Sequence, residues 1–336
     1  MNSAESGSTD SGCLPAPYRI LPHELPFRIP GFLKQARPSD RVLAPVACDC
    51  ETWFDSFASH VASSVGRRFL PVCRMSDGEF FFLFGRQPPS LRLSAAARFR
   101  RRIRQALGSL RGMARGFHAS TAASVSSGDF SAAEWRRYRP LLSQDYLAVL
   151  EAGVLGIHLS YGKSAFQEHY FPAIARWLAQ ADRRLTLANY VPFYFVYALL
   201  RGPRFREIIA NRRLLVVHSA TGVKRDSIIA ALRQHGARSV SWLAISSNRS
   251  FADTLDLSSV TDAPDACLVG AGIGKSRVIR QLEPLGVPCI DAGYAFEVWA
   301  DPDKQWDRPY MTPDEVFDAT KVRFLSPDDR AMLGRT

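Results

Sequence analysis

ACLVGAGIGKSRVIRQLEPLGVPCID, residues 266–291, contains the clearest architectural pattern of the chain. A short apolar segment at 266–269 is followed by a glycine-rich turn, a helical stretch at 277–285 and a second apolar segment at 288–290. Short strands that are apolar on both faces and are joined by helices are typical of parallel sheets covered on both sides. These residues therefore predict a strand–helix–strand unit within a parallel α/β sheet.

The same alternation extends outward from this unit through most of the chain. We expect one Rossmann-like α/β layer, a mostly parallel sheet of about six strands with helices on both faces and no internal repeat. Further strands are predicted at residues 68–74, 154–159, 185–187, 214–218 and 240–245. Helices are predicted at residues 53–65, 91–115, 166–179 and 227–234, with Ser76 or Asp77 as the N-cap before an apolar segment at 80–84.

Composition sets the class of the protein. The 336 residues are 46% hydrophobic and 22% charged, with a mean hydropathy of −0.10, which excludes a disordered, collagen-like or fibrous chain. Residues 1–40 are rich in Ser, Gly and Pro and predict a flexible or loosely packed N-terminal arm. We expect a single α/β domain at 41–305 and an extended C-terminal tail at 306–336.

Several features indicate a cytoplasmic protein. The longest apolar run, YVPFYFVYALL at 190–200, is about half the roughly 20 residues that span a bilayer. The N-terminal residues carry neither the basic nor the apolar region of a secretion signal, and the six cysteines are scattered without the spacing of a zinc site. The net charge of +11 favours an anionic partner such as a phosphate, a nucleic acid or an acidic membrane surface.

The glycine-rich turn carries the first candidate ligand site. Gly270, Gly272, Gly274 and Lys275 lie between a strand and a helix, where backbone N–H groups bind anions. A Walker A loop would need Gly in place of Val269, and the dinucleotide fingerprint would need Gly in place of Lys275. Kinase, ATPase and dehydrogenase functions are therefore disfavoured. Two interpretations stay open: a phosphate-binding loop with Lys275 as counter-charge, or a tight turn whose glycines only permit close packing.

Asp77-Gly78-Glu79 is the second candidate site. It follows the apolar strand predicted at 68–74, at the carboxyl end where open α/β sheets bind ligands. In an extended segment, residues i and i+2 face the same side, so both carboxylates would converge on one point. Paired oxygen ligands of this kind suit Mg²⁺ or Mn²⁺. The alternative is a solvated turn, which such a triplet forms more often.

Arg74-Met-Ser-Asp77-Gly78-Glu79-Phe resembles the R-x-G-D-G-E signature of the GT-D-type glycosyltransferases. Residues 267–275 and 286–293 are similar to the late strand, glycine loop and G-x-x-A-I-D-I-G-H segment of that family. The family has a single Rossmann-like domain in which a D-x-E motif holds a divalent cation on a sugar nucleotide. The resemblance covers roughly residues 65–305, with weaker similarities at residues 218–226, Asn248 and Phe251.

The resemblance implies a metal-dependent, hexosyltransferase-type enzyme of polysaccharide biosynthesis, with residues 41–305 as its catalytic domain. It would move a sugar from a nucleotide diphosphate donor, with UDP as the implied nucleotide, to a glycan or lipid-linked glycan acceptor. Asp77 and Glu79 would be the catalytic and metal-binding residues, holding Mn²⁺ or Mg²⁺ against the departing diphosphate. The implied nucleotide- and diphosphate-binding residues are Arg74, Gly78, Gly270, Gly272, Gly274, Lys275 and Asp291.

The sequence also departs from the family pattern. Ser76 stands where the family has Gly, His218 where it has Glu and Tyr294 where it has His, so the roles of the last two are not carried over. For Asp291, the alternative to a ligand-binding role is a structural one, as a turn residue or a helix N-cap. The sequence does not single out a general base for the acceptor hydroxyl; the candidates are His218, Asp253 and Glu297.

The helix predicted at 91–115 is strongly basic. A basic amphipathic helix can lie on an anionic membrane, which would suit a lipid-linked acceptor and peripheral contact with the inner membrane face; a solvated helix face is the alternative. Nucleic-acid binding is disfavoured because the cations are not expected to alternate with exposed aromatic residues and no recognisable nucleic-acid-binding module is present. A non-catalytic module that binds an acidic polymer or membrane, and another nucleotide-dependent transferase, stay open. The basic residues are Arg98, Arg100, Arg101, Arg102, Arg104, Arg111 and Arg115.

Overall fold

The computed structural model describes residues 50–84, 132–157, 173–174, 176–183, 185–186, 188–307, 311 and 321. The predicted N-terminal arm, the basic helix and nearly all of the tail lie outside these residues. Much of the helix predicted at 166–179 lies outside as well, and its described residues from 173 onward are helical. The predicted domain boundaries and the membrane contact therefore stay predictions.

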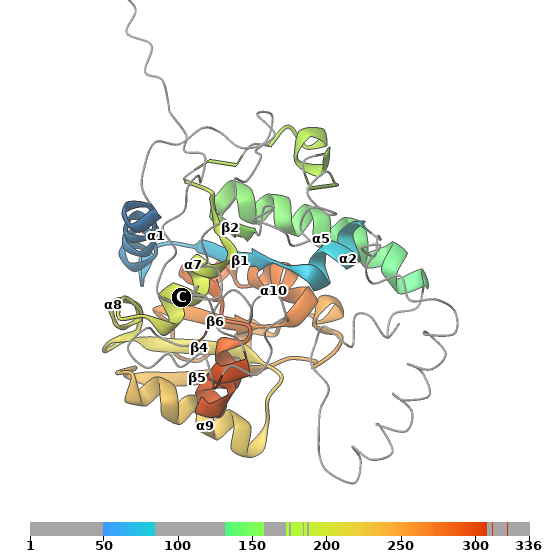
Figure 1. Cartoon of the computed structure of the whole chain (residues 1–336). Coiled ribbons are helices and arrows are strands. Elements are labelled where there is room, and N and C mark those ends of the chain that lie inside the picture. The colour runs from blue at the N-terminus through green and yellow to red at the C-terminus, as the bar shows by residue number, and fades with distance from the viewer. Residues whose placement is uncertain are drawn as a thin grey trace, which may run out of the picture.

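A parallel sheet forms the centre of the described structure (Figure 1). Within the described residues it has seven strands in the order β3-β2-β1-β7-β6-β4-β5, and the neighbouring strands pair in parallel. This topology confirms the predicted Rossmann-like α/β class. The strands are β1 (Leu70–Met75), β2 (Val154–Ile157), β3 (Tyr190–Pro192), β4 (Arg213–His218), β5 (Ser239–Ala244), β6 (Ala266–Gly270) and β7 (Pro288–Asp291).

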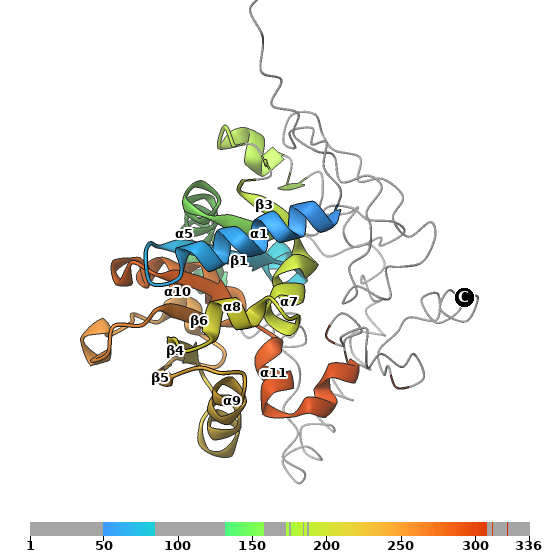
Figure 2. The same ribbon diagram turned by 90° about the vertical axis from the view of Figure 1, so that its left-hand side faces the viewer.

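Helices cover both faces of this sheet (Figure 2). On one face α5 and α10 pack against each other and against β1, and α10 also contacts β6 and β7. On the opposite face α7 contacts β1, β2 and β3, and it also contacts α8 and α11. Helix α9 packs on α11, and α1 packs on α8. The helices are α1 (Cys50–Ser64), α2 (Asp77–Phe84), α5 (Ala132–Ala152), α7 (Phe193–Arg201), α8 (Phe205–Ile209), α9 (Gly222–Gln234), α10 (Lys275–Gln281) and α11 (Ala295–Ala300).

Short 3-10 turns complete the described connections. They are η3 (Ser250–Ala252), η4 (Leu257–Ser259), η5 (Gly272–Gly274), η6 (Glu283–Leu285) and η7 (Pro302–Asp307). Turns η5 and η6 flank α10, so the helix predicted at 277–285 is divided into α10 and η6, and the glycine-rich turn is itself a single 3-10 turn. No described helix is both long and apolar enough to cross a bilayer.

The structure corrects the strand predicted at 185–187. The chain pairs with β2 at Tyr190–Pro192 instead, because Asn189 folds back on Thr186. Asn189 Oδ1 accepts hydrogen bonds from Thr186 N at 2.8 Å and from Thr186 Oγ1 at 3.2 Å, which closes a turn just before β3. Of the predicted strand, Leu185 is buried and forms an isolated bridge, Thr186 lies in no strand, and residue 187 lies outside the described residues.

The sequence analysis did not predict α5, α7, α8 or α11, of which α5 and α7 are the longest. α7 occupies most of the apolar run at 190–200; it shows no polar face because Phe195, Val196 and Leu199 are fully buried between the sheet and the neighbouring helices. α5 is long and polar on one side, and it includes Pro140, a residue that normally argues against a helix interior.

Candidate functional site

The carboxyl ends of β1, β6 and β7 meet at one edge of the sheet (Figure 1). After β1 and β6 the chain continues into α2 and α10, on the face that carries α5, whereas after β7 it continues into α11 on the opposite face. In open α/β sheets a ligand crevice forms where neighbouring strands send their connections to opposite faces. The carboxyl end of β7 lies between two such neighbours and is the position at which this topology favours a ligand.

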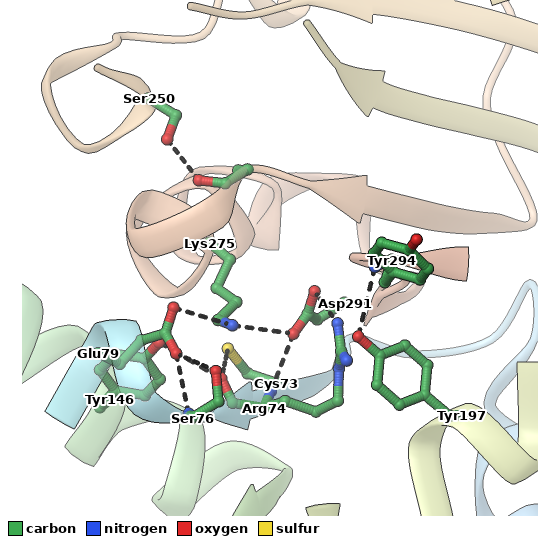
Figure 3. A network of polar contacts seen from close by, with 11 residues as sticks. Cys73, Arg74, Ser76, Glu79, Tyr146, Tyr197, Ser250, Lys275, Asp291 and Tyr294 are labelled. Carbon is green, nitrogen blue, oxygen red and sulfur yellow. Dashed lines mark hydrogen bonds and ion pairs between the residues drawn. The ribbon is translucent and has the colours of Figure 1, made fainter. Parts of the chain in front are cut away.

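Four buried charged side chains meet at this position, and we refer to them as the charge cluster (Figure 3). Arg74 Nη2 of β1 lies 2.9 Å from Asp291 Oδ1 of β7. Lys275 Nζ, at the start of α10, lies 3.0 Å from Glu79 Oε1 of α2 and 3.4 Å from Asp291 Oδ2. The members of the cluster are between 1% and 5% exposed. The structure thus brings together Arg74, Glu79, Lys275 and Asp291, which the sequence analysis had selected from two distant segments.

The charges of the cluster stabilise one another. Burial alone would raise the pKa of the Asp291 carboxyl, but the nearby charges of Arg74 and Lys275 outweigh it and hold that pKa below its usual value. Burial alone would lower the pKa of Lys275, but Asp291 and Glu79 outweigh it and raise the pKa. Asp291 and Lys275 are therefore both charged at neutral pH, and two cations face two anions in a formally neutral group.

Arg74 is fixed by aromatic rings and by a glycine. Its guanidinium carbon lies 3.8 Å from the centre of the Tyr197 ring and 5.2 Å from that of Phe193, both on α7. Gly293 has φ +43°, and a Cβ at that position would overlap Arg74 Nη2. A residue with a side chain at 293 is therefore incompatible with the ion pair between Arg74 and Asp291. The sequence signal for this contact is the aromatic run at 190–200, which the sequence analysis considered only for its apolar length.

The geometry predicted for Asp77-Gly78-Glu79 is wrong. The segment is not extended: α2 begins at Asp77, so residues 77 and 79 point about 200° apart around a helix rather than to one side. Ser76 is the N-cap, as one of the sequence alternatives had it. Glu79 Oε2 accepts hydrogen bonds from Ser76 N and Ser76 Oγ, both at 2.8 Å; the first of these is the bond that the N3 carboxylate makes in a capping box. The backbone of Asp77 is described, but its side chain is not.

A divalent cation does not fit at Glu79 while the Lys275 ammonium lies there. Glu79 directs one carboxylate oxygen to Lys275 and the other to Ser76, so a metal ion at Glu79 would have to displace the ammonium or lie beside a like charge. Among the described residues, no group of three or more His, Cys, Asp or Glu side chains has a geometry that could hold a metal. The metal-binding role of Asp77 and Glu79 stays a prediction that the described atoms do not test.

The glycines of the turn after β6 make close packing contacts. A Cβ at Gly270 would overlap the rings of His218 and Phe296, and a Cβ at Gly274 would overlap the backbone of Phe251. Lys275, which follows them, points into the charge cluster (Figure 3). The described contacts therefore match the packing interpretation of these glycines, while a role in binding phosphate stays a prediction.

His218 ends β4 opposite Gly270. Burial, with a further contribution from the charge of Lys224, lowers the pKa of His218 to about 4. Its Nδ1 accepts a hydrogen bond from Ala220 N at 2.8 Å, so in the neutral ring the proton is on Nε2. His218 is therefore a neutral hydrogen-bond donor at pH 7 and a poor general base.

The other candidate bases also have partners. Glu297 Oε1 lies 2.5 Å from Lys224 Nζ, and both side chains are about one-third exposed. Asp253 accepts hydrogen bonds from Ser246 N at 2.6 Å and from Ser246 Oγ at 2.7 Å, which closes the turn after β5. The described residues do not single out a general base.

No family model matches the chain. No curated protein matches it either. A selenomethionine-substituted structure of domain of unknown function 1792 (DUF1792) is similar over 73% of this chain and 85% of that chain, at 12% sequence identity and a TM-score of 0.37.

Proposed function

We propose that this chain is a glycosyltransferase that binds a nucleoside-diphosphate sugar at the carboxyl edge of the sheet, between β1 and β7. One observation carries the proposal. The two segments that resemble GT-D-type glycosyltransferases, one around Arg74 and Glu79 and the other around Lys275 and Asp291, contribute the side chains of a single buried cluster. That cluster lies where the topology of the sheet favours a ligand.

Unpaired polar atoms near the cluster also favour a binding role. Arg74 Nε and Ser276 Oγ are buried without a hydrogen-bond partner among the described residues. Buried polar groups are nearly always paired, so such atoms are expected where a site is completed by a ligand. Both atoms are hydrogen-bond donors or can act as donors, which suits the oxygen-rich surface of a diphosphate or a sugar.

The chemistry of the proposed reaction explains why charged groups belong here. When the glycosyl bond to a nucleoside diphosphate breaks, negative charge develops on the departing diphosphate. Fixed, buried donors and cations stabilise such a charge better than water does, because they need no reorganisation during the reaction. In this proposal the charge cluster orients the end of β7 and the start of α10 around the diphosphate, and the acceptor is a glycan or a lipid-linked glycan.

The proposal is tested by nucleotide binding followed by turnover. Purified full-length protein is titrated with UDP, GDP, CDP and TDP, each with Mn²⁺ and with EDTA, and unfolding is followed by thermal shift. A nucleotide at 100 times its dissociation constant should stabilise the fold by about 2.7 kcal/mol. Hydrolysis and transfer are then measured with the matching nucleotide sugars. Absence of a shift and of turnover with every nucleotide would reject the proposal.

Variants locate the activity. Glu79→Gln and Asp77→Asn should each reduce turnover, whereas Glu151→Gln should not. Glu151 is the matched control because it is an acidic residue in an exposed ion pair with Arg183 (3.1 Å), just before β2 and therefore at the opposite edge of the sheet. Equal activity in all three variants would place the reaction elsewhere.

A non-catalytic binding module is the second candidate function. The observation that favours it is that the charge cluster is formally neutral and that each of its four charged side chains has an ion-pair partner without a ligand. In that case the fold would bind an acidic polymer or membrane through other surfaces, and no nucleotide would stabilise it. Another nucleotide-dependent transferase would show a shift with its own nucleotide but no glycosyl transfer.

A further inference from the structure

Lys275 occupies a position between two carboxylates that come from different parts of the chain. Its ammonium nitrogen lies 3.0 Å from Glu79 Oε1 on α2 and 3.4 Å from Asp291 Oδ2 at the end of β7. Figure 3 shows the side chain descending from α10 to the point where these carboxylates converge. Two converging carboxylates are the donors that Mg²⁺ and Mn²⁺ use in proteins. Here an amino group, covalently attached to the chain, lies between them.

The remaining carboxylate oxygens are engaged by other groups. Glu79 Oε2 accepts from Ser76 N and Ser76 Oγ. Asp291 Oδ1 accepts from Arg74 Nη2, and Asp291 Oδ2 accepts from Arg74 N at 3.2 Å besides facing Lys275. A metal ion bound by either carboxylate would have to displace one of these donors.

Lys275 is also held in place. Its side chain is only 7% exposed and lies against both carboxylates, at 3.0 Å from Glu79 and 3.4 Å from Asp291. A divalent ion beside this ammonium would be repelled by a like charge in a buried, weakly screened environment. Binding the ion would therefore require Lys275 to leave both of its partners.

We propose that Lys275 is the resident cation of this site: it replaces a divalent metal between Glu79 and Asp291, and the site binds its diphosphate ligand without one. That Lys275 takes the place of a divalent metal such as Mn²⁺ is a claim about the protein alone. That the site binds a diphosphate without a metal rests on the proposed function.

The first experiment titrates Mn²⁺ into the full-length wild-type protein and follows the free ion by electron paramagnetic resonance. We expect no stoichiometric loss of the free-ion signal. Stoichiometric Mn²⁺ binding that disappears in Glu79→Gln would overturn the proposal. Because this measurement uses the wild type, it decides the question even if variants at position 275 fail to fold.

The second experiment removes the ammonium and keeps its volume. Lys275→Met removes the cation that faces Glu79 and leaves Asp291 paired with Arg74 alone. The variant should bind Mn²⁺ about tenfold or more tightly than the wild type, since cation affinity follows the charge of the ligand set. The double variant Lys275→Met with Glu79→Gln should lose that gain. A folded Lys275→Met protein that gains no Mn²⁺ affinity would show that Lys275 does not occupy a cation position.

Lys224→Met is the matched control. Lys224 forms a close ion pair with Glu297, but the pair is about one-third exposed, and among the described residues Lys224 makes no ion pair with a second carboxylate. This variant should not gain Mn²⁺ affinity. An equal gain in Lys224→Met would show that the effect is one of net charge and would count against the proposal.

Nucleotide binding completes the test. The nucleoside diphosphate that stabilises the wild type should do so to the same extent in EDTA and in Mn²⁺, whereas a strict Mn²⁺ requirement would overturn the proposal. If no nucleotide binds under either condition, the proposed glycosyltransferase function fails, and the Mn²⁺ titrations alone decide the role of Lys275. The two failures are thus distinguishable.

Discussion

Arg74 Nη2 and Asp291 Oδ1 form a buried ion pair at 2.9 Å that joins β1 to β7 at their carboxyl ends. The pair links two neighbouring strands, β1 and β7, that are followed by helices on opposite faces of the sheet. It also holds Asp291 next to Lys275. The position of the candidate site therefore depends on this contact. The glycine that permits this contact is Gly293, and His218 and Ser76 lie at the same edge of the sheet.

Asp291→Asn should destabilise the fold strongly. The variant leaves Arg74 and Lys275 buried with one carboxylate instead of two, and breaking a buried ion pair costs about 3–5 kcal/mol. Urea unfolding followed by circular dichroism measures the change. Glu151→Gln is the control: it breaks an exposed pair with Arg183 and should cost no more than about 1 kcal/mol. Similar losses in the two variants would show that the buried pair contributes little.

Gly293→Ala should be more destabilising than Gly286→Ala. Both glycines have positive φ, +43° and +66°, so each alanine carries a backbone penalty of about 1–2 kcal/mol. Only the Cβ at 293 would overlap Arg74, whereas nothing lies within 4 Å of the position at 286. Overpacking should add about 1–3 kcal/mol for Gly293→Ala in the same unfolding measurement. Equal losses would mean that Arg74 moves aside freely.

Acid should destabilise the fold through His218. Its pKa is about 4 in the folded protein, against the usual 6.5, so below pH 6.5 the unfolded chain takes up a proton that the folded protein does not. The contribution of His218 to stability is complete above pH 6.5 and is lost as the pH falls toward 4, by about 3 kcal/mol in total.

His218→Gln should remove this part of the pH dependence when urea unfolding is measured at several values between pH 7 and 4. His60 and His235 also have lowered pKa values, because burial and nearby arginines disfavour their charged forms. They contribute in the same direction, so some pH dependence remains in the variant. A curve for His218→Gln that is parallel to that of the wild type would contradict the prediction.

Ser76→Ala should cost about 1 kcal/mol of stability, the usual loss when an N-cap hydroxyl is removed. The hydroxyl donates to Glu79 Oε2 at 2.8 Å at the start of α2, in addition to the bond from Ser76 N. Ser63→Ala is the control, since its exposed hydroxyl donates to His60 O and its loss should change stability by no more than about 0.5 kcal/mol. Equal effects would show that the capping box is not formed.

Ser76→Gly restores the residue of the family pattern, and it separates the two roles of this position. Glycine is tolerated at an N-cap with a loss of only a few tenths of a kcal/mol, so the fold should be nearly unchanged. The bond from the backbone N–H to Glu79 is kept in this variant. A change in nucleotide binding without a change in stability would then show that the hydroxyl affects the ligand rather than the helix.

The features of the fold that depend on local sequence patterns were predicted from the sequence alone. Short apolar segments such as those at 266–269 and 288–290 predicted strands of a parallel sheet, and the polar residues that follow them, Lys275 and Asp291, were predicted at its carboxyl edge. The N-cap at Ser76 was also predictable, since capping depends on a few consecutive residues. The strand expected at 185–187 is reduced to a bridge at Leu185, because a turn between Thr186 and Asn189 precedes β3.

Which charged side chains pair with one another depends on the tertiary structure and could not be predicted from local patterns. The periodicity of a segment does not say which strand lies beside it, and the order that places β1 next to β7 follows from burying apolar faces that are far apart in the chain. That order brings Arg74 to Asp291 and Lys275 to Glu79, whereas the sequence had paired Glu79 with Asp77 in an extended segment. Local sequence specifies elements and their ends, but long-range packing specifies partners, because a buried charge must find its counter-charge wherever the fold places it.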